Sequence, residues 1–535
     1  MNFGHKLSTI QYNNNSNKEL WKLSKFLKNR NKQLPPLKVG GQTLLTSLEK
    51  SNALASQFAE NHQNPLASNN VSHTNYIENS VNRFIRNCTE NEEELELTTL
   101  NEVTQIVSQL KNTKAPGFDE IQSTLIKHLP PIGFIIMTLI FNSCLTLSYF
   151  PKIWKLAKVI SIRKPGKPPS APTSYRPISL LSILSKILER IILVRLKNHL
   201  QDNNIIPEVQ HGFRENRSTV TQLNRLTNHI KNGLTNKLST GLILLDIEKA
   251  FDRVWHKGLL FKLITTNAPK YIIKIIRSFL ESRSFQVVVQ GSKSATHNIN
   301  FGVPQGSVLS PTLYSIYTYD LPVNTHCSIA LFADDTALFS SSRFAKTIIK
   351  ALEKTAKELQ RYFNKWKIKL NESKTQAIFF TRRRTKQIPR RPFHMNNADV
   401  EWEASTVKYL GLVLDKRLTF KNHTELAISK ATKAFRILYS LFNRQSKLNV
   451  YCKVLLYKVT IRPILMYAAP VMNQIAVLHK KKLQVMQNKI LRTILNVPWH
   501  TSTKSIHEET QMEIITDFMN KLTTKFQSKY EELFS

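Results

Sequence analysis

Two short apolar runs in the second half of the chain flank a pair of acids. Residues 328–331 read Ser-Ile-Ala-Leu and residues 336–339 read Thr-Ala-Leu-Phe, with Asp334 and Asp335 between them. Runs of this length and β character, joined by a short polar turn, predict a β-hairpin with acids at its tip. Adjacent carboxylates repel each other unless a cation lies beside them. The hairpin is therefore a candidate divalent-metal site, although Asp-Asp pairs also occur in ordinary solvated turns.

Other stretches predict further strands and helices. Residues 242–245 are continuously apolar, the pattern of a buried strand, and Asp246 follows directly. Apolar residues at three- and four-residue spacing predict a helix over residues 183–200, and helices are also expected near 44–61 and 97–110. After about residue 421 the pattern is helical throughout. We therefore predict a partly disordered leader or connector over 1–95, mixed helices and strands over 96–420, and helices over 421–535.

One apolar run, residues 132–150, is long enough to suggest a short membrane span. Gly133, Asn142, Ser143 and Ser148 interrupt it. These polar and small residues favour a buried helix of a large domain, and we expect no membrane partner. The polar, Asn-rich first residues show no secretory signal.

The charge balance narrows the class of partner. The 535 residues include 76 Lys and Arg against 37 Asp and Glu, a formal net charge of +39. Such an excess is typical of proteins that bind a polyanion, with nucleic acid first and acidic membrane second. Four scattered cysteines without a CxxC spacing argue against a disulfide framework or a zinc knuckle and suit a reducing compartment.

Three further segments give the acidic hairpin a family context. Residues 242–252 read LILLDIEKAFD, residues 302–311 read GVPQGSVLSP and residues 174–180 read SYRPISL. In this order and spacing, together with Phe332-Ala333-Asp334-Asp335, they resemble the finger and palm motifs of reverse transcriptases. The resemblance is nearest to the non-LTR retrotransposon type, and within it to jockey-like elements. It implies an α+β right-hand polymerase, with fingers and an antiparallel palm sheet over 96–420 and a helical thumb and C-terminal region over 421–535.

The resemblance also implies a reaction and its partners. The reaction is RNA-directed DNA synthesis from a 3′-hydroxyl primer, with Mg²⁺ as cofactor and Mn²⁺ as an alternative. Asp246 and Asp334 would bridge the metal ions, and Asp335 would assist. The expected partners are an RNA template, a DNA primer or target and dNTPs. The expected location is the nucleus and cytoplasm, in a ribonucleoprotein. Glu248 and Asp252 lie nearby in sequence and are expected to be surface charge or local salt bridges.

Six positions match the family's nucleotide-binding residues. Phe251 would be a gate beneath the sugar, with a core Phe as the alternative. Lys374 would lie near the phosphates, with a helix-end cation as the alternative. For the basic position before the Pro-Gly turn, Arg163 and Lys164 both remain open. The complete set is Arg163, Lys164, Arg176, Phe251, Gln305 and Lys374.

Seven positions match contacts with template and primer. The run Gln210-His211-Gly212-Phe213-Arg214, which contains four of these positions, resembles a template-strand contact, although His211 alone would be an ordinary surface or core histidine. The turn Tyr409-Leu410-Gly411 resembles the hairpin that grips the primer end. Two basic clusters fit tracking of a phosphate backbone: Arg382, Arg383, Arg384, Arg390 and Arg391, and Lys480, Lys481 and Lys482.

Two rival functions remain open. One is a degenerate copy that binds nucleic acid without polymerising, against which the intact acids argue. The other is a maturase-like splicing factor, which the jockey-like run 461–470 disfavours. Such elements usually carry an N-terminal endonuclease, and residues 1–95 offer no such motif set. We therefore expect nicking activity to be separate or missing.

Overall fold

The computed structural model describes residues 34–63, 70–87, 95–323, 327–382, 391–395, 398–402 and 405–530. An antiparallel sheet of four strands lies at the centre of the fold, in the order β11 (Gln376–Phe380), β5 (Ser239–Leu245), β10 (Asp335–Ser342) and β9 (Ser328–Phe332). The predicted hairpin is confirmed, because β9 and β10 pair with Phe332 opposite Asp335. Every residue of β5 is buried, which explains its unbroken apolar run.

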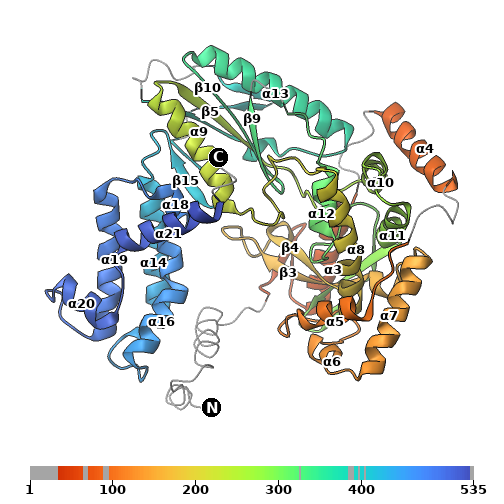
Figure 1. Ribbon diagram of the computed structural model, residues 1–535, viewed down its shortest axis with the longest axis horizontal. Helices are drawn as coiled ribbons and strands as arrows, with labels where there is room; N and C mark the ends of the chain where they lie inside the picture. Colours follow the sequence, from red (N-terminus) through yellow and green to blue (C-terminus); the bar gives the residue numbers. More distant parts are fainter. Residues whose placement is uncertain are drawn as a thin grey trace.

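Both faces of this sheet are covered, because successive side chains of a strand point to opposite sides. Ile243 and Leu245 share a core with α13 (Ala345–Lys365). Leu242 and Leu244 join a second core with α9 (Thr219–Thr235) and the C-terminal helices. The acid-bearing strand ends therefore rest on a sheet that is packed from both sides (Figure 1).

A second sheet lies beside the first and carries the strand of the Tyr-Arg-Pro-Ile-Ser motif. Its order is β4 (Tyr175–Leu180), β3 (Leu156–Arg163), β6 (Arg283–Val289) and β7 (Ser292–Lys293), and β8 (His297–Ile299) also pairs with β6. The β3 and β6 strands are parallel, and the other pairs are antiparallel. After β4 the chain enters α8 (Ile183–Asp202), which confirms the predicted amphipathic helix.

The described part of the predicted leader is folded onto this sheet. It contains a small hairpin, β1 (Leu37–Val39) and β2 (Gln42–Leu44), then α3 (Ser47–Asn61) and α4 (Val71–Asn87). Leu54 and Phe58 of α3 share a core with Val159 and Phe285, and α4 contributes Ile77 and Val81 to the larger core. The helix expected near residues 44–61 is therefore confirmed as α3, and the apolar faces of α3 and α4 are buried against the strands and helices that follow.

The apolar run at 132–150 forms α7 (Pro131–Thr146), and it is buried on one face only. Phe141, Cys144 and Leu145 lie in the core, whereas Ile132 and Leu139 are 58% and 61% exposed. The prediction of a buried helix is thus correct for half of its surface. At 16 residues α7 is about 24 Å long, short of the ~30 Å hydrocarbon layer. Within the described ranges, no helix combines the length and apolar character that a membrane crossing requires.

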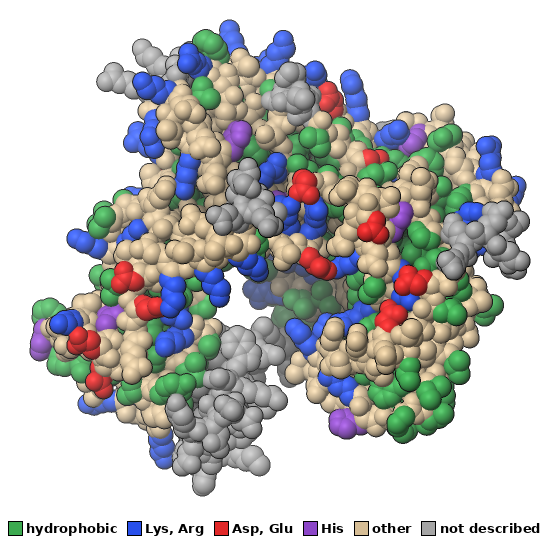
Figure 2. All heavy atoms as spheres, in the orientation of Figure 1, with side chains coloured by type: hydrophobic (Ala, Val, Ile, Leu, Met, Phe, Trp, Pro, Cys, Tyr) green, Lys and Arg blue, Asp and Glu red, His purple; other side chains and the backbone are tan. Residues whose placement is uncertain are grey.

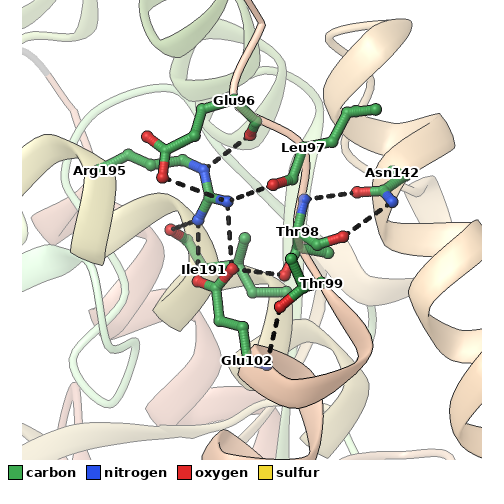
Figure 3. A network of polar contacts seen from close by, with 8 residues as sticks. All are labelled: Glu96, Leu97, Thr98, Thr99, Glu102, Asn142, Ile191 and Arg195. Atoms are coloured by element: carbon green, nitrogen blue, oxygen red, sulfur yellow. Dashed lines mark hydrogen bonds and ion pairs between the residues drawn. The ribbon is translucent and has the colours of Figure 1, made fainter.

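A buried arginine joins α8 to the segment before α5 (Leu100–Ser108), as Figure 3 shows. The Arg195 guanidinium donates to the Glu102 carboxylate at 2.9 and 3.1 Å and to the carbonyl oxygens of Glu96 and Leu97 at 2.9 and 3.0 Å. Thr98 donates its backbone N–H to Asn142 of α7 at 2.8 Å. A buried cation needs such complete pairing. The network fixes residues 96–102 between α7 and α8.

The remaining elements complete the fold. Helices α10 (His256–Thr265), α11 (Lys270–Leu280) and α12 (Ser310–Tyr317) pack in the larger core, to which α6 (Ser123–Lys127) contributes Ile126. Two short hairpins follow α13, and then helices, as predicted from residue 421. These elements are β12 (Phe393–Met395), β13 (Ala398–Val400), β14 (Thr406–Tyr409), β15 (Leu412–Asp415), α14 (Lys421–Ile437), α15 (Tyr439–Phe442), α16 (Val450–Thr460), α17 (Arg462–Leu465), α18 (Ala469–Met472), α19 (Val477–Leu495), α20 (Thr503–Thr510) and α21 (Ile515–Tyr530).

The C-terminal helices, drawn in blue in Figure 1, stand apart from the helices around the second sheet. Figure 2 shows a hollow between these two parts on the face in view, with Lys and Arg side chains on both of its sides. A basic hollow between two lobes suits a polyanionic partner.

Candidate active site

The three predicted acids come together at the end of the four-stranded sheet. Asp246 follows β5, and Asp335 begins β10. Leu245 pairs with Thr336, so the same antiparallel register brings Asp246 opposite Asp335. Asp334 lies in the turn, where Ala333 takes the left-handed conformation with φ of 57°. Residues that are about 90 positions apart in sequence are thus brought to one edge.

Burial and mutual repulsion raise the pKa of two of these acids. Burial, followed by the charges of Asp334 and Asp246, raises the pKa of Asp335 to about 6. Burial and the charge of Asp246 also raise the pKa of Asp334, against the opposing influence of Arg176 and Lys374. A cation bound beside these carboxylates would therefore reduce their mutual repulsion.

The acids suit a hard divalent cation in their chemistry, because Mg²⁺ takes oxygen ligands. They do not form a ready-made ligand set. In the part of the chain that the structure describes, no three His, Cys, Asp or Glu side chains are arranged to hold a metal ion. Asp246 instead accepts a hydrogen bond from Lys374 Nζ at 2.9 Å. Asp246, Asp334 and Asp335 are the residues that would hold a metal, and their joint role stays a prediction.

Basic side chains from both sheets face these acids. Arg176 is opposite Ile162 in the β3–β4 pair, and Lys164 is two residues further along on the same face. Burial and the positive charges of Arg176, Lys374 and Lys249 lower the pKa of Lys164. We refer to Asp246, Asp334, Asp335, Lys164, Arg176 and Lys374 as the carboxylate centre.

The same register separates the two basic residues that the sequence could not distinguish. Arg163 is opposite Tyr175 and is exposed on the other face of β3. Lys164 donates to the carbonyl oxygen of Thr173 at 2.8 Å, close to the loop that leads into β4. The structure therefore brings Lys164, and not Arg163, to the carboxylate centre.

The Gly-Val-Pro-Gln-Gly loop is pressed against β4 and the segment after β5. The Gln305 side-chain amide donates to the Asp252 carboxylate at 2.7 Å, and the Gln305 backbone carbonyl oxygen accepts from Ser179 N. A Cβ at Gly306 would lie 2.3 Å from the Ser179 oxygen, so this contact requires glycine. Asp252 is only 3% exposed. The expectation of a surface charge is wrong for Asp252, because Gln305 satisfies it in the interior.

Glu248 forms local salt bridges, as predicted from the sequence. It pairs with Arg253 at 2.9 Å and with Lys369 at 3.5 Å. It therefore stays beside the carboxylate centre without facing its acids.

Phe251 packs against the larger core as part of a group of aromatic rings. Its ring stacks on Tyr314 at 5.0 Å between centroids, and Phe213 meets it edge-on at 6.0 Å. Burial and the charges of Asp334 and Asp335 raise the pKa of Tyr314, which therefore lies beside the acids. Phe251 is only partly buried. It thus forms part of the floor next to the acids, as a gate residue would.

The predicted template segment supports the acid-bearing turn from behind. The Gln210 side-chain oxygen accepts from Gly212 N at 2.7 Å and from Ala333 N at 3.0 Å. A Cβ at Gly212 would lie 2.2 Å from Ala333 N, so the two backbones touch. His211 is 2% exposed and bonds Thr221 at 2.9 Å, and burial lowers its pKa to about 4. Its side chain does not face solvent in this structure, as expected of the core histidine that was the alternative, and its template contact stays a prediction.

Phe213 and Arg214 remain accessible after that segment. Phe213 is 49% exposed and adopts a left-handed conformation with φ of 59°. Arg214 donates to the Pro207 carbonyl oxygen and pairs with Glu208 at 3.3 Å. Both stay predicted template contacts.

The Tyr409-Leu410-Gly411 turn joins β14 to β15 next to the acids. Leu410 and Gly411 both have positive φ, 43° and 87°. Tyr467, from the C-terminal helices, donates to the Leu410 carbonyl oxygen at 2.5 Å. The Tyr409 hydroxyl is buried without a hydrogen-bond partner among the described residues, and burial and the charge of Asp335 raise its pKa.

A pocket of about 360 Å³ connects this hairpin with the acids. Its lining includes Asp246, Asp335, Lys374, Lys408 and Tyr409. The sequence did not point to Lys408, Tyr314 or the buried role of Asp252. Lys408 directly precedes the predicted turn at Tyr409, so the motif could have indicated it. Tyr314 and Asp252 depend on contacts with distant segments that no local pattern reveals.

The two basic clusters give a divided result. Arg383, Arg384 and Arg390 lie outside the described residues. Lys481 is exposed on α19, and Lys482 pairs with Glu425 at 3.7 Å. Their contact with a phosphate backbone stays a prediction.

The domain around these residues belongs to a known class. Residues 162–414 match the family model described as reverse transcriptase (RNA-dependent DNA polymerase), and all three acids fall within that range. The chain thus carries a reverse transcriptase domain. Its relatives within this class are the RNA-directed DNA polymerases of jockey and other non-LTR retrotransposons, which confirms the resemblance drawn from the motifs.

Three relatives illustrate the similarity. The RNA-directed DNA polymerase from mobile element jockey of Drosophila melanogaster is 35% identical over 528 residues, 96% of this chain and 56% of that protein. Its counterpart from Drosophila funebris is 38% identical over 442 residues, 81% of this chain and 48% of that protein. A probable RNA-directed DNA polymerase from transposon BS of Drosophila melanogaster is 32% identical over 548 residues, 98% and 58% of the two chains. The chain thus spans roughly half of the length of these relatives.

Proposed function

We propose that this chain is the RNA-directed DNA polymerase of a jockey-like non-LTR retrotransposon. In this proposal the four-stranded sheet is the palm. The five-stranded sheet with the helices packed on it forms the fingers, and the helices from residue 421 form the thumb. The basic hollow between fingers and thumb would hold the template–primer duplex (Figure 2).

The observation that carries the proposal is the carboxylate centre itself. The three acids lie at adjacent strand ends of an antiparallel sheet, and Lys164, Arg176 and Lys374 face them from two other segments. Phosphoryl transfer needs this combination, because oxygen ligands hold a divalent cation while cations neutralise the phosphates. In a protein that only binds nucleic acid, three clustered acids would repel the phosphates and weaken binding.

The basic residues of the centre would bind the incoming nucleotide. Arg176 has a guanidinium that can pair bidentately with phosphate, and Lys164 adds a point charge on the same face. Phe251, stacked on Tyr314, would lie under the sugar and exclude a 2′-hydroxyl by contact. Gln305 is already bonded to Asp252, so it would position the loop rather than reach the base.

The pocket beside the hairpin would receive the primer end. Tyr409 and Lys408 line it together with Asp246 and Asp335, so a 3′-hydroxyl there would lie beside the acids. Lys408 would pair with a primer phosphate there. When Mg²⁺ is bound, it supplies activation of the attacking hydroxyl and neutralisation of the departing pyrophosphate. The acids of this chain would hold that ion, with Mn²⁺ as a substitute.

The other expected partners belong to the same proposal. They are an RNA template, a DNA primer or target and dNTPs, in a ribonucleoprotein found in the cytoplasm and nucleus. The net charge of +39 fits such partners and predicts binding that weakens steeply with salt.

Primer extension on poly(rA)/oligo(dT) tests the proposal, because the primer is supplied and no nicking is required. Asp334→Asn keeps the side-chain size but removes a charge that would hold the metal. We expect extension to fall by about three orders of magnitude or more, with duplex binding retained. Mg²⁺ should raise the Tm of the wild-type chain and not that of the variant.

The matched control is Asp202→Asn, an exposed acid at the end of α8, which should extend normally. Near-normal extension by Asp334→Asn would refute the assignment of the acids. Binding without any extension by the wild-type chain would instead identify a degenerate copy.

A further inference from the structure

A pocket in the C-terminal helices shares no residue with the carboxylate centre. It has a volume of about 780 Å³ and lies between the end of α15, the second half of α19 and the loop that follows α19. Helix α19 lies at the left of the C-terminal region in Figure 1. We call it the C-terminal pocket and define it by Tyr439, Arg444, Lys489, Arg492 and Trp499.

The charge of its lining is entirely positive. Arg444, Lys489 and Arg492 line it, and no Asp or Glu does. Within the described ranges, Arg444 and Lys489 form no ion pair, and Arg492 bonds only the Thr501 carbonyl oxygen, at 2.8 Å. Three cations around one concave surface attract an anion.

Two aromatic rings flank the same pocket. Trp499 is 85% exposed and Tyr439 is 49% exposed. An indole left in water forgoes the free energy that its burial would contribute, so exposure of this size indicates a partner that covers the ring. The amide side chains of Asn443 and Gln445 add donors and acceptors beside the rings.

We propose that the C-terminal pocket binds a short stretch of single-stranded nucleic acid, with a base stacked on Trp499 and phosphates on Arg444 and Lys489. Stacking platforms with interleaved cations are how proteins hold unpaired strands. A duplex keeps its bases stacked inside and offers only phosphates, so it makes no use of the exposed rings. An acidic peptide would engage the cations but would leave the indole face without a stacking partner.

This site would be separate from the one that holds the template–primer duplex. It would keep an unpaired part of the same RNA, or a free DNA strand, attached to the protein while the carboxylate centre is occupied. RNA and DNA present the same bases and phosphates here, so the two sources are distinguished by experiment.

The test uses the full chain with unlabelled template–primer duplex at saturation. The probe is a fluorescent oligo(dT) or oligo(rU) of about ten nucleotides. Trp499→Ala should weaken probe binding about tenfold. The double variant Arg444→Gln with Lys489→Gln should reduce the slope of log K against log salt by about 1.4, at roughly 0.7 per phosphate contact. Extension on the short duplex should remain at the wild-type level in both.

The matched control removes an equally exposed ring and an exposed lysine elsewhere. Phe344 is 71% exposed and Lys350 is exposed on α13, so Phe344→Ala with Lys350→Gln should leave the probe affinity unchanged. Tighter binding of oligo(rU) or of oligo(dT) would identify the strand that the pocket prefers. Wild-type affinity and slope in the pocket variants would overturn the proposal, as would displacement of the probe by polyglutamate as readily as by unlabelled oligonucleotide. Loss of extension by Asp334→Asn is measured separately and does not bear on this result.

Discussion

The carboxylate centre and the C-terminal pocket both contain several Lys and Arg side chains, but the surroundings of these side chains differ. In the centre, Lys374 lies 2.9 Å from the Asp246 carboxylate, and backbone atoms of other segments press against the turn that carries Asp334. In the pocket, Arg444 and Lys489 lie beside exposed rings without a described acid partner. Chemistry on a phosphate requires opposite charges fixed before the substrate arrives. Retention of a strand requires only accessible charge and a flat ring.

After the loss expected from Asp334→Asn, the largest contrast should come from adding a single methyl group to the centre. Gly212→Ala would place a Cβ 2.2 Å from Ala333 N, so the turn bearing Asp334 must move. A shift of about 1 Å in a catalytic group costs roughly a hundredfold in rate. We therefore expect primer extension to fall about a hundredfold, whereas Trp499→Ala in the pocket leaves it unchanged. The control is Gly133→Ala within α7, where the nearest atom is a Leu129 side-chain carbon at 3.2 Å. Equal activity of the two glycine variants would show that the turn is not held as tightly as described.

A smaller effect should separate selection of the nucleotide from its binding. Phe251→Ala removes the ring stacked on Tyr314 and opens space beside the acids. We expect the preference for dGTP over rGTP to fall about tenfold, since a lost steric contact is worth about 1–3 kcal/mol. The pocket variants should keep the wild-type ratio. An unchanged ratio in a folded, active Phe251→Ala protein would mean that Phe251 serves packing alone.

The smallest effect should appear in stability. The pKa of Asp335 is raised to about 6 by burial and by its acidic neighbours, above the roughly 3.9 of an exposed aspartate. The folded chain therefore binds this proton more tightly than the unfolded chain does. Its free energy of unfolding falls as the pH rises from about 4 to 6, and this loss persists at higher pH.

Asp335→Asn should remove that loss. In metal-free buffer we expect its Tm to exceed that of wild type by about 2 °C near pH 7.5, and the difference to vanish below about pH 4. Replacing Lys489 by Gln in the pocket should give no such pH-dependent difference. A lower Tm for Asp335→Asn at neutral pH would show that the charge stabilises the fold.

The local pattern was sufficient to predict the acids and the hairpin that carries them. Asp246 ends a strand buried on both faces, and Asp334 and Asp335 interrupt two β runs, so each signal lies within about ten residues. The helices after residue 421 were equally visible, because their apolar spacing is regular. The motif order then supplied the family.

What the sequence could not provide depends on contacts between distant segments. Asp252 looks like a surface acid until Gln305, 53 residues later, is placed against it. His211 looks like a surface contact until Thr221 and β9 enclose it. Lys164 and Arg163 differ only in the face of β3 that they occupy, and a shift of one residue in register would exchange them.

The packing of α3 and α7 could not be predicted from the sequence for a related reason. Composition alone does not show that α3 has a sheet to cover, as Leu54 and Phe58 do. Nor does an all-apolar helix reveal which of its sides meets the core, as Ile132 and Phe141 illustrate.

The packing of the four-stranded sheet has a consequence for how such chains can recombine. One face of the sheet, through Leu242, Ala330 and Phe339, belongs to the same core as α9 and the C-terminal helices. Tyr467 from those helices also holds the turn next to Tyr409. The C-terminal region is therefore not an exchangeable module. Recombination near residue 420 between the genes of two diverged relatives would combine the two halves of this core from different proteins. The side chains of the two halves would then no longer fit each other. Descendants that retain activity should inherit residues from α9 to α21 as one block.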